Sequence, residues 1–170
     1  MAIHLLYEEE LDASIAQVMQ ELGVEGLTDY EKIKAIYDYV CKNVTYDYQH
    51  LNDVNYQLKY TAYAALINKT AVCQGYATLL YRMLLEAGLD SRIVAGATHA
   101  WNIVKLGDKY YYLDATWDSQ RDIYGFFLRG TDDLDDNSYT KEHTLNGEYL
   151  SDEFQESYPM AEEKYSENAD

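Results

Sequence analysis

The sequence contains few cysteines, few basic residues and no long apolar run. Its two cysteines, Cys41 and Cys73, are too few to build a disulfide framework or a zinc site by themselves. Thirteen basic residues against 30 acidic ones give a net charge of -17, and a field of that sign repels phosphate backbones and anionic lipid. No apolar run approaches the about 18 residues that cross a membrane, and the N-terminus has no basic-then-apolar signal pattern. We therefore expect no nucleic-acid partner and no membrane insertion, whereas cationic and neutral substrates stay open.

Length and composition predict one globular domain. The 170 residues are enough to bury a hydrophobic core, and 48% of them are hydrophobic. Phenylalanine is scarce, at three residues against nineteen tyrosines, and tyrosine suits half-buried sheets and amphipathic clefts. With no internal repeat and no linker, we expect a single domain over 1–170, with its core at about 28–128 and an acidic extension over 129–170. The two ends of the chain suit a whole protein or a domain cut from a longer one, so compartment and oligomeric state stay open.

Hydrophobic periodicity predicts helices in the first half of the chain and strands in the second. A capping box at Thr28 and Glu31 opens a helix whose apolar face contains Cys41, so we expect this cysteine to be structural. Helices preceding an antiparallel sheet indicate an α+β fold. The predicted helices cover 8–22, 28–44, 62–67, 74–86 and 152–156, with a long loop at 45–60, and the predicted strands cover 91–95, 100–106, 110–114 and 123–128.

Three residues in or next to these predicted helices and strands have the chemistry of a thiol enzyme. Cys73 stands where the predicted helix 74–86 begins, and a helix N-terminus or a nearby imidazole favours the reactive thiolate over the thiol. His99 could take up the proton of the thiol, and Asp114 could orient His99. Taken singly, each has a structural alternative: a core cysteine, a satisfied histidine, or an aspartate that caps a turn before Ala115.

The turn at 107–109 decides whether His99 and Asp114 can meet. A two-residue turn makes Leu106 face Lys109, which places Trp101 opposite Asp114 and His99 opposite Thr116. His99 and Asp114 then project from the same face of the hairpin. A three-residue loop would place them on opposite faces unless a bulge restored the register.

Further residues are candidates for binding the substrate. The backbone N–H of Cys73 is a natural donor to an oxyanion, and a side chain could supplement it. The candidates for this donor are Gln74, Tyr60 and Tyr63, and Trp101 is a candidate for the substrate cleft.

No metal or other cofactor is expected. The acidic run Asp132–Asn137 lacks the glycine and the terminal glutamate of an EF-hand loop, so a solvated loop is the preferred interpretation. His4, His50 and His143 are scattered along the chain and indicate no metal site.

Three sequence blocks resemble the transglutaminase-like superfamily of papain-type folds, in its bacterial branch. The blocks are Ala71–Ala77, Gly96–Asn102 and Tyr111–Asp118, within a resemblance that spans roughly 28–128. The resemblance implies Cys73 as nucleophile, His99 as base and acid, and Asp114 as orienting carboxylate. It also implies a nucleophile helix packed on an antiparallel sheet. The calcium-binding pattern on which animal transglutaminases depend is not found.

The resemblance leaves the reaction open. We expect a transglutaminase-like cysteine acyltransferase that forms a thioester from a peptide or protein amide. The alternatives are a cysteine peptidase or amidase with the same triad, or a catalytically silent binding module, as in a secreted or cell-surface bacterial protein.

Overall fold

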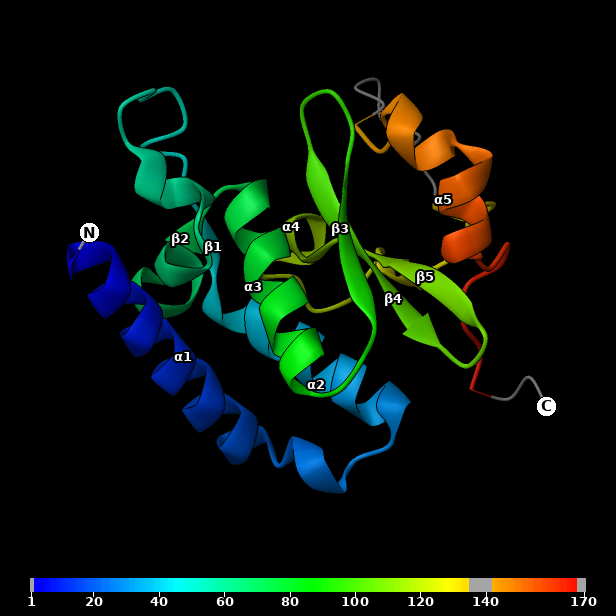
Figure 1. The fold of residues 1–170 in the computed structure, drawn as a ribbon, viewed down its shortest axis with the longest axis horizontal. Helices are drawn as coiled ribbons and strands as arrows, with labels where there is room; N and C mark the ends of the chain where they lie inside the picture. Colours follow the sequence, from blue (N-terminus) through cyan, green and yellow to red (C-terminus); the bar gives the residue numbers. More distant parts are fainter. Residues whose placement is uncertain (1, 135–141, 168–170) are drawn as a thin grey trace.

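The computed structural model describes residues 2–134 and 142–167 and has the expected α+β fold (Figure 1). Helices α1, α2 and α3 lie on one side of a four-stranded antiparallel sheet of order β3-β4-β5-β6, and α5 lies on the other side. The elements are α1 (Ala2–Leu22), η1 (Val24–Gly26), α2 (Asp29–Asn43), β1 (Thr45–Tyr46), η2 (Gln57–Tyr60), η3 (Ala64–Asn68), β2 (Thr70–Ala71), α3 (Cys73–Glu86), β3 (Ser91–Ala95), β4 (Ala100–Leu106), β5 (Lys109–Leu113), α4 (Ala115–Asp118), β6 (Phe127–Arg129), η4 (Gly147–Leu150) and α5 (Asp152–Ser157).

The capping box predicted for α2 is confirmed. The side chain of Thr28 accepts a hydrogen bond from the backbone N–H of Glu31, and the Glu31 carboxylate accepts one from the N–H of Thr28. These reciprocal bonds satisfy two of the N–H groups that a helix start leaves without partners. Cys41 is buried in the core, as its place on the apolar face of α2 predicts.

The hairpin β4–β5 has the register predicted for a two-residue turn. Leu106 pairs with Lys109 and Asn102 with Leu113, and Gly107 adopts a φ of 70°, which suits such a turn. The prediction that this register continues, with Trp101 opposite Asp114 and His99 opposite Thr116, is wrong. Asp114 caps α4 and ends the strand, so Thr116 lies in a helix.

The strand predicted over 123–128 is only partly correct. β6 covers Phe127–Arg129 alone, because the N–H groups of Gly125 and Phe126 donate to the carboxylate of Asp118 instead of to a neighbouring strand. The predicted loop 45–60 also contains short elements. β1 pairs in parallel with β2, and η2 closes the segment. The predicted helix 62–67 is a π-helical turn, η3, with Ala62 and Tyr63 leading into it.

The sheet separates two hydrophobic cores. The larger core lies between the sheet and the helices α1, α2 and α3. On the opposite face, Trp101, Ile103 and Tyr112 pack against residues of the C-terminal extension, among them Phe154 and Met160. The extension is thus folded onto the sheet where the structure describes it. Within the described residues, no helix combines the length and the apolar character needed to cross a membrane.

Candidate active site

Cys73 is the first residue of α3 and is half-buried. Gly75, in the first turn of this helix, explains how the helix start is placed. A Cβ atom at Gly75 would lie 2.6 Å from Ala71 Cβ, 2.9 Å from the carbonyl oxygen of Lys59 and 3.0 Å from that of Thr61. Only glycine therefore lets the first turn of α3 approach η2 and β2 this closely.

His99 and Asp114 meet, although Asp114 caps α4 instead of continuing the predicted β4–β5 register. His99 Nε2 lies 2.6 Å from Asp114 Oδ2, and His99 is also hydrogen-bonded to Cys73. Burial by itself lowers the pKa of His99, but the hydrogen bonds and negative charges of Asp114 and Cys73 outweigh it and raise this pKa to about 10. The His99 ring thus favours the protonated form. Its Nε2 donates to the Asp114 carboxylate, and its Nδ1 is available to donate to the sulfur of Cys73.

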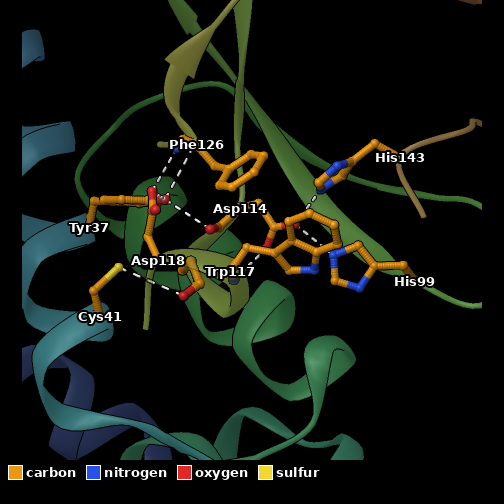
Figure 2. Close-up of polar contacts among 9 residues, drawn as sticks. Tyr37, Cys41, His99, Asp114, Trp117, Asp118, Phe126 and His143 are labelled. Carbon is orange, nitrogen blue, oxygen red and sulfur yellow. Dashed lines mark hydrogen bonds and ion pairs between the residues drawn. The ribbon is translucent and has the colours of Figure 1, made fainter. Parts of the chain in front are cut away.

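His143 is a partner of Asp114 that the sequence interpretation missed. His143 Nε2 lies 2.6 Å from Asp114 Oδ2, the same oxygen that His99 contacts (Figure 2). Burial alone would raise the pKa of Asp114, but the bonds to His143 and His99 hold it below its usual value. The sequence contains no spacing signal for this contact, because His143 follows Asp114 by 29 residues in an acidic, polar segment.

Asp114 is also an N-cap, as its structural alternative predicts. Its Oδ1 accepts a hydrogen bond from the N–H of Trp117 and caps α4. Its backbone carbonyl lies 2.9 Å from Tyr37 Oη, and the same hydroxyl is 2.7 Å from Asp118 Oδ2. Tyr37 thereby ties α2 to both ends of α4, as Figure 2 shows.

Cys41 lies apart from these groups. Its Sγ is 3.8 Å from the carbonyl oxygen of Ala115, and its side chain points into the core (Figure 2). Burial first, and then the negative charges of Asp118 and Asp38, raise the pKa of this thiol well above its usual value. The two thiols therefore differ in exposure and surroundings.

A cleft of about 790 Å³ adjoins the thiol and the imidazole. One wall comes from the segment after α2, with Tyr46, Tyr48 and Leu51. Its lining residues are Thr45, Tyr46, Tyr48, Leu51, Cys73, Thr98, His99, Thr116, Trp117, Ser119, Gln120 and Glu142.

The four residues predicted for the oxyanion or the cleft do not line this cavity. Gln74 is exposed on the first turn of α3, next to Cys73. Tyr60 is half-buried at the end of η2, and the hydroxyl of Tyr63 donates to Glu10 on α1. Trp101 is buried behind the site with its ring 5.6 Å from that of His99.

The cluster of His99, Asp114 and His143 is also close enough to be tested as a metal site, since its ligand atoms lie within 4.8 Å of one another. The Nε2 atoms of His99 and His143, however, each lie 2.6 Å from the same oxygen, Asp114 Oδ2. Two ligands at about 2.1 Å from one zinc ion would be roughly 3.4 Å apart, so the observed distances are those of hydrogen bonds.

His50 and the acidic run make structural contacts where they are described. His50 Nδ1 is 2.9 Å from the buried carboxylate of Asp47. In the acidic run, Asp133 accepts hydrogen bonds from the N–H groups of Gly130 and Lys164, and Asp135–Asn137 lie outside the described residues. His4 is exposed on α1.

Comparison with known proteins points to one superfamily. A family model described as the transglutaminase-like superfamily matches residues 16–115, which include Cys73, His99 and Asp114 but not His143. Kyphoscoliosis peptidase from Mus musculus is 29% identical over 144 residues, covering 70% of this chain and 22% of that protein. The same peptidase from Homo sapiens is 28% identical with the same coverage. The chain thus spans about a fifth of the length of these curated relatives.

Solved structures agree with this match. One described as a TGase is 26% identical, with a TM-score of 0.55 over 63% of this chain and 32% of that chain. Another, of a candidate cysteine protease from Cytophaga hutchinsonii, is 23% identical, with a TM-score of 0.50 over 62% of this chain and 37% of that chain. At this identity the second likeness concerns the fold alone.

Proposed function

The chain belongs to the transglutaminase-like superfamily, and from this premise we propose that it is a thiol acyltransferase acting on peptide or protein amides. Cys73 is the nucleophile, His99 the base and acid, and Asp114 the carboxylate that orients His99. One observation carries the proposal. A partly exposed thiol at a helix start lines a cleft and is hydrogen-bonded to an imidazole that is itself 2.6 Å from a buried carboxylate.

In the first step, the thiolate of Cys73 forms a carbon–sulfur bond to the amide carbonyl carbon, and the carbonyl oxygen takes the negative charge. Protonated His99 gives its Nδ1 proton to the leaving nitrogen as the carbon–nitrogen bond breaks. The products are an amine or ammonia and a thioester on Cys73. The Nε2–H of His99 stays on Asp114 throughout, which keeps the ring in place.

In the second step, neutral His99 accepts at Nδ1 the proton of the incoming nucleophile. An amine or a water molecule bonds to the acyl carbon, and the carbon–sulfur bond breaks to restore the thiolate. An amine gives a new amide, and water gives a carboxylic acid.

The backbone N–H of Cys73 is the first proposed donor to the oxyanion, because helix-start N–H groups lack intrahelical partners. Gln74 stays a prediction for the second donor. Tyr46 is an additional candidate, since it lines the cleft near the thiol. Burial and then the negative charge of Cys73 raise the pKa of Tyr46 to about 12, so its hydroxyl keeps its proton at neutral pH.

Hydrolysis is the second candidate function, with the same triad and water as acceptor. It is favoured by the curated relatives, which are described as peptidases. A silent binding module would fit a buried Cys73 without a cleft, whereas this thiol is partly exposed and lines one.

Mass spectrometry of a glutamine peptide incubated with the protein and an isotope-labelled primary amine distinguishes these functions. We expect incorporation of the amine for transfer, and peptide cleavage or deamidation alone for hydrolysis. Cys73→Ala should abolish either product, and Cys41→Ala should retain it. Equal product from wild type and Cys73→Ala would contradict both functions.

A further inference from the structure

His143 is enclosed together with Asp114 behind the proposed triad. Its side chain is 1% exposed, and its ring centroid lies 4.4 Å from that of Trp117, 5.0 Å from that of Trp101 and 5.3 Å from that of Phe126. These aromatic groups exclude water from the contact between His143 and Asp114. A hydrogen bond in such surroundings is electrostatically stronger than one in water.

The segment that carries His143 is fixed on the end of β3 and on Gly96, which follows it. A Cβ atom at Gly96 would lie 2.4 Å from the carbonyl oxygen of Thr144, so glycine is what allows this approach. Beyond it, the N–H of Asn146 donates to the carbonyl of Ala95, and the side-chain amide of Asn146 donates to that of Gly96. Gly96 belongs to the same sequence block as His99, which connects the block to the segment around His143.

We propose that His143 is a positioning residue of the triad, which donates from Nε2 to Asp114 Oδ2 and holds this carboxylate in the orientation that fixes His99. The proposal rests on the proposed function. It implies that a segment beyond the family match at 16–115 completes the site.

The geometry gives His143 a specific task. A carboxylate can rotate about its last side-chain bond, and a single partner does not stop this rotation. Here Oδ1 is held by the N–H of Trp117, and Oδ2 by both His99 and His143. A displacement of about 1 Å in such a support can cost roughly 100-fold in rate.

The same bond stabilises the negative charge that His99 needs. Each N–H donor favours the ionised carboxylate over the neutral acid. The other groups near this charge are the Tyr37 hydroxyl, on the backbone carbonyl of Asp114, and the Asp118 carboxylate in the next helical turn. Within the described part of the chain, the Asp114 carboxylate bonds to the rings of His99 and His143 and to the backbone N–H of Trp117.

Nitrogen-15 NMR of the histidine rings in the wild-type protein tests the bond directly and needs no substrate. We expect His143 and His99 to carry a proton on Nε2 from pH 6 to 9. A His143 ring protonated at Nδ1 alone over this range would overturn the proposal. Because this measurement uses no variant, a failure of any variant to fold does not affect it.

His143→Phe then tests the role, with His143→Gln as the conservative variant and exposed His4→Phe as the matched control. The readouts are the carboxyl titration of Asp114 by NMR and the rate of Cys73 alkylation by iodoacetamide at pH 6.5. We expect His143→Phe to raise the pKa of Asp114 and to slow alkylation about 10- to 100-fold. His143→Gln should restore the rate to within about threefold, and His4→Phe should equal wild type.

A folded His143→Phe protein with the wild-type Asp114 titration and the wild-type alkylation rate would overturn the proposal. So would equal loss in His143→Phe and His143→Gln. Neither readout requires turnover. If no amide substrate is ever found, the proposed function fails while the positioning role is still decided.

Discussion

Asp114 shows how one side chain serves two purposes at this site. Its two oxygens separate the tasks, since Oδ1 caps α4 and Oδ2 accepts from the two imidazoles. The cap fixes the side chain relative to the backbone, and a carboxylate fixed in this way can orient His99. The catalytic and structural interpretations of this residue therefore support each other.

The two cysteines should differ sharply in reactivity. We expect iodoacetamide at mildly acidic pH to label wild type and Cys41→Ala but not Cys73→Ala, because Cys41 is 1% exposed and Cys73 lines the cleft beside His99. Peptide mapping by mass spectrometry identifies the labelled thiol. Equal reactivity at both positions, with the pH profile of an ordinary cysteine, would contradict the triad.

Stability should depend on pH through His99. Its pKa is raised to about 10, so the stabilisation from its proton is fully present below the unfolded value of about 6.5 and is lost as pH rises through about 10. Urea unfolding of wild type and His99→Gln between pH 6 and 10.5 measures this. We expect the difference in unfolding free energy between wild type and His99→Gln to shrink above about pH 6.5 and to be smallest near pH 10.5. An advantage that grows with pH would contradict the assigned ion pair.

At the scale of elements, α3 depends on a close approach at its first turn. Gly75→Val should destabilise the protein by about 1–3 kcal/mol, because two of the three atoms that meet the new Cβ are backbone carbonyls, which cannot move aside easily. Gly26→Ala is the control, since a Cβ there meets nothing within 4 Å. Urea denaturation measures both variants. A Gly75→Val protein as stable as Gly26→Ala would show that this packing is unimportant.

The cleft wall after β1 is held by a buried lysine. Lys59, 1% exposed, donates to the carbonyls of His50 at 2.6 Å, Asp53 at 2.8 Å and Leu51 at 3.3 Å. We expect Lys59→Met to lower the free energy of unfolding by about 2–4 kcal/mol, because the carbonyls lose charge-assisted bonds. Exposed Lys34→Met, which loses one surface ion pair, should cost about 0–1 kcal/mol.

Amide hydrogen exchange over 48–54 locates the effect of Lys59→Met. We expect faster exchange in this wall segment and a higher KM in any turnover assay. Lys59→Met could instead lower the global free energy of unfolding while exchange over 48–54 changes no more than in other loops. That result would contradict the idea that Lys59 specifically holds the cleft wall.

The sequence could predict the elements whose signals are local. The capping box of α2 and the apolar face of α2 are short-range patterns, and the two-residue turn sets the register of β4 and β5. Local patterns could not show that the strand predicted over 123–128 begins only at Phe127. The N–H groups of Gly125 and Phe126 bond to Asp118, and this partner depends on tertiary structure. The π-helical turn at Ala64–Asn68 likewise has no distinct sequence pattern.

At the scale of the whole molecule, the site is assembled from three parts of the chain. The start of α3 and the hairpin contribute Cys73, His99 and Asp114, and the order of these residues and the turn that joins β4 to β5 can be found in the sequence. The third part, the segment at 142–146, follows an acidic stretch in the sequence and contributes His143. Nothing local predicts its docking, because it depends on space left at Gly96, which becomes visible only in three dimensions.

The central claim is that Cys73 forms a thioester, and trapping that intermediate tests it most directly. A glutamine peptide is mixed with the protein, quenched in acid and digested for mass spectrometry. We expect the peptide that contains Cys73 to gain the acyl mass with loss of ammonia in wild type and Cys41→Ala, and to gain nothing in His99→Gln. Absence of the adduct from Cys73 in wild type, or equal adducts on Cys41 and Cys73, would contradict the claim.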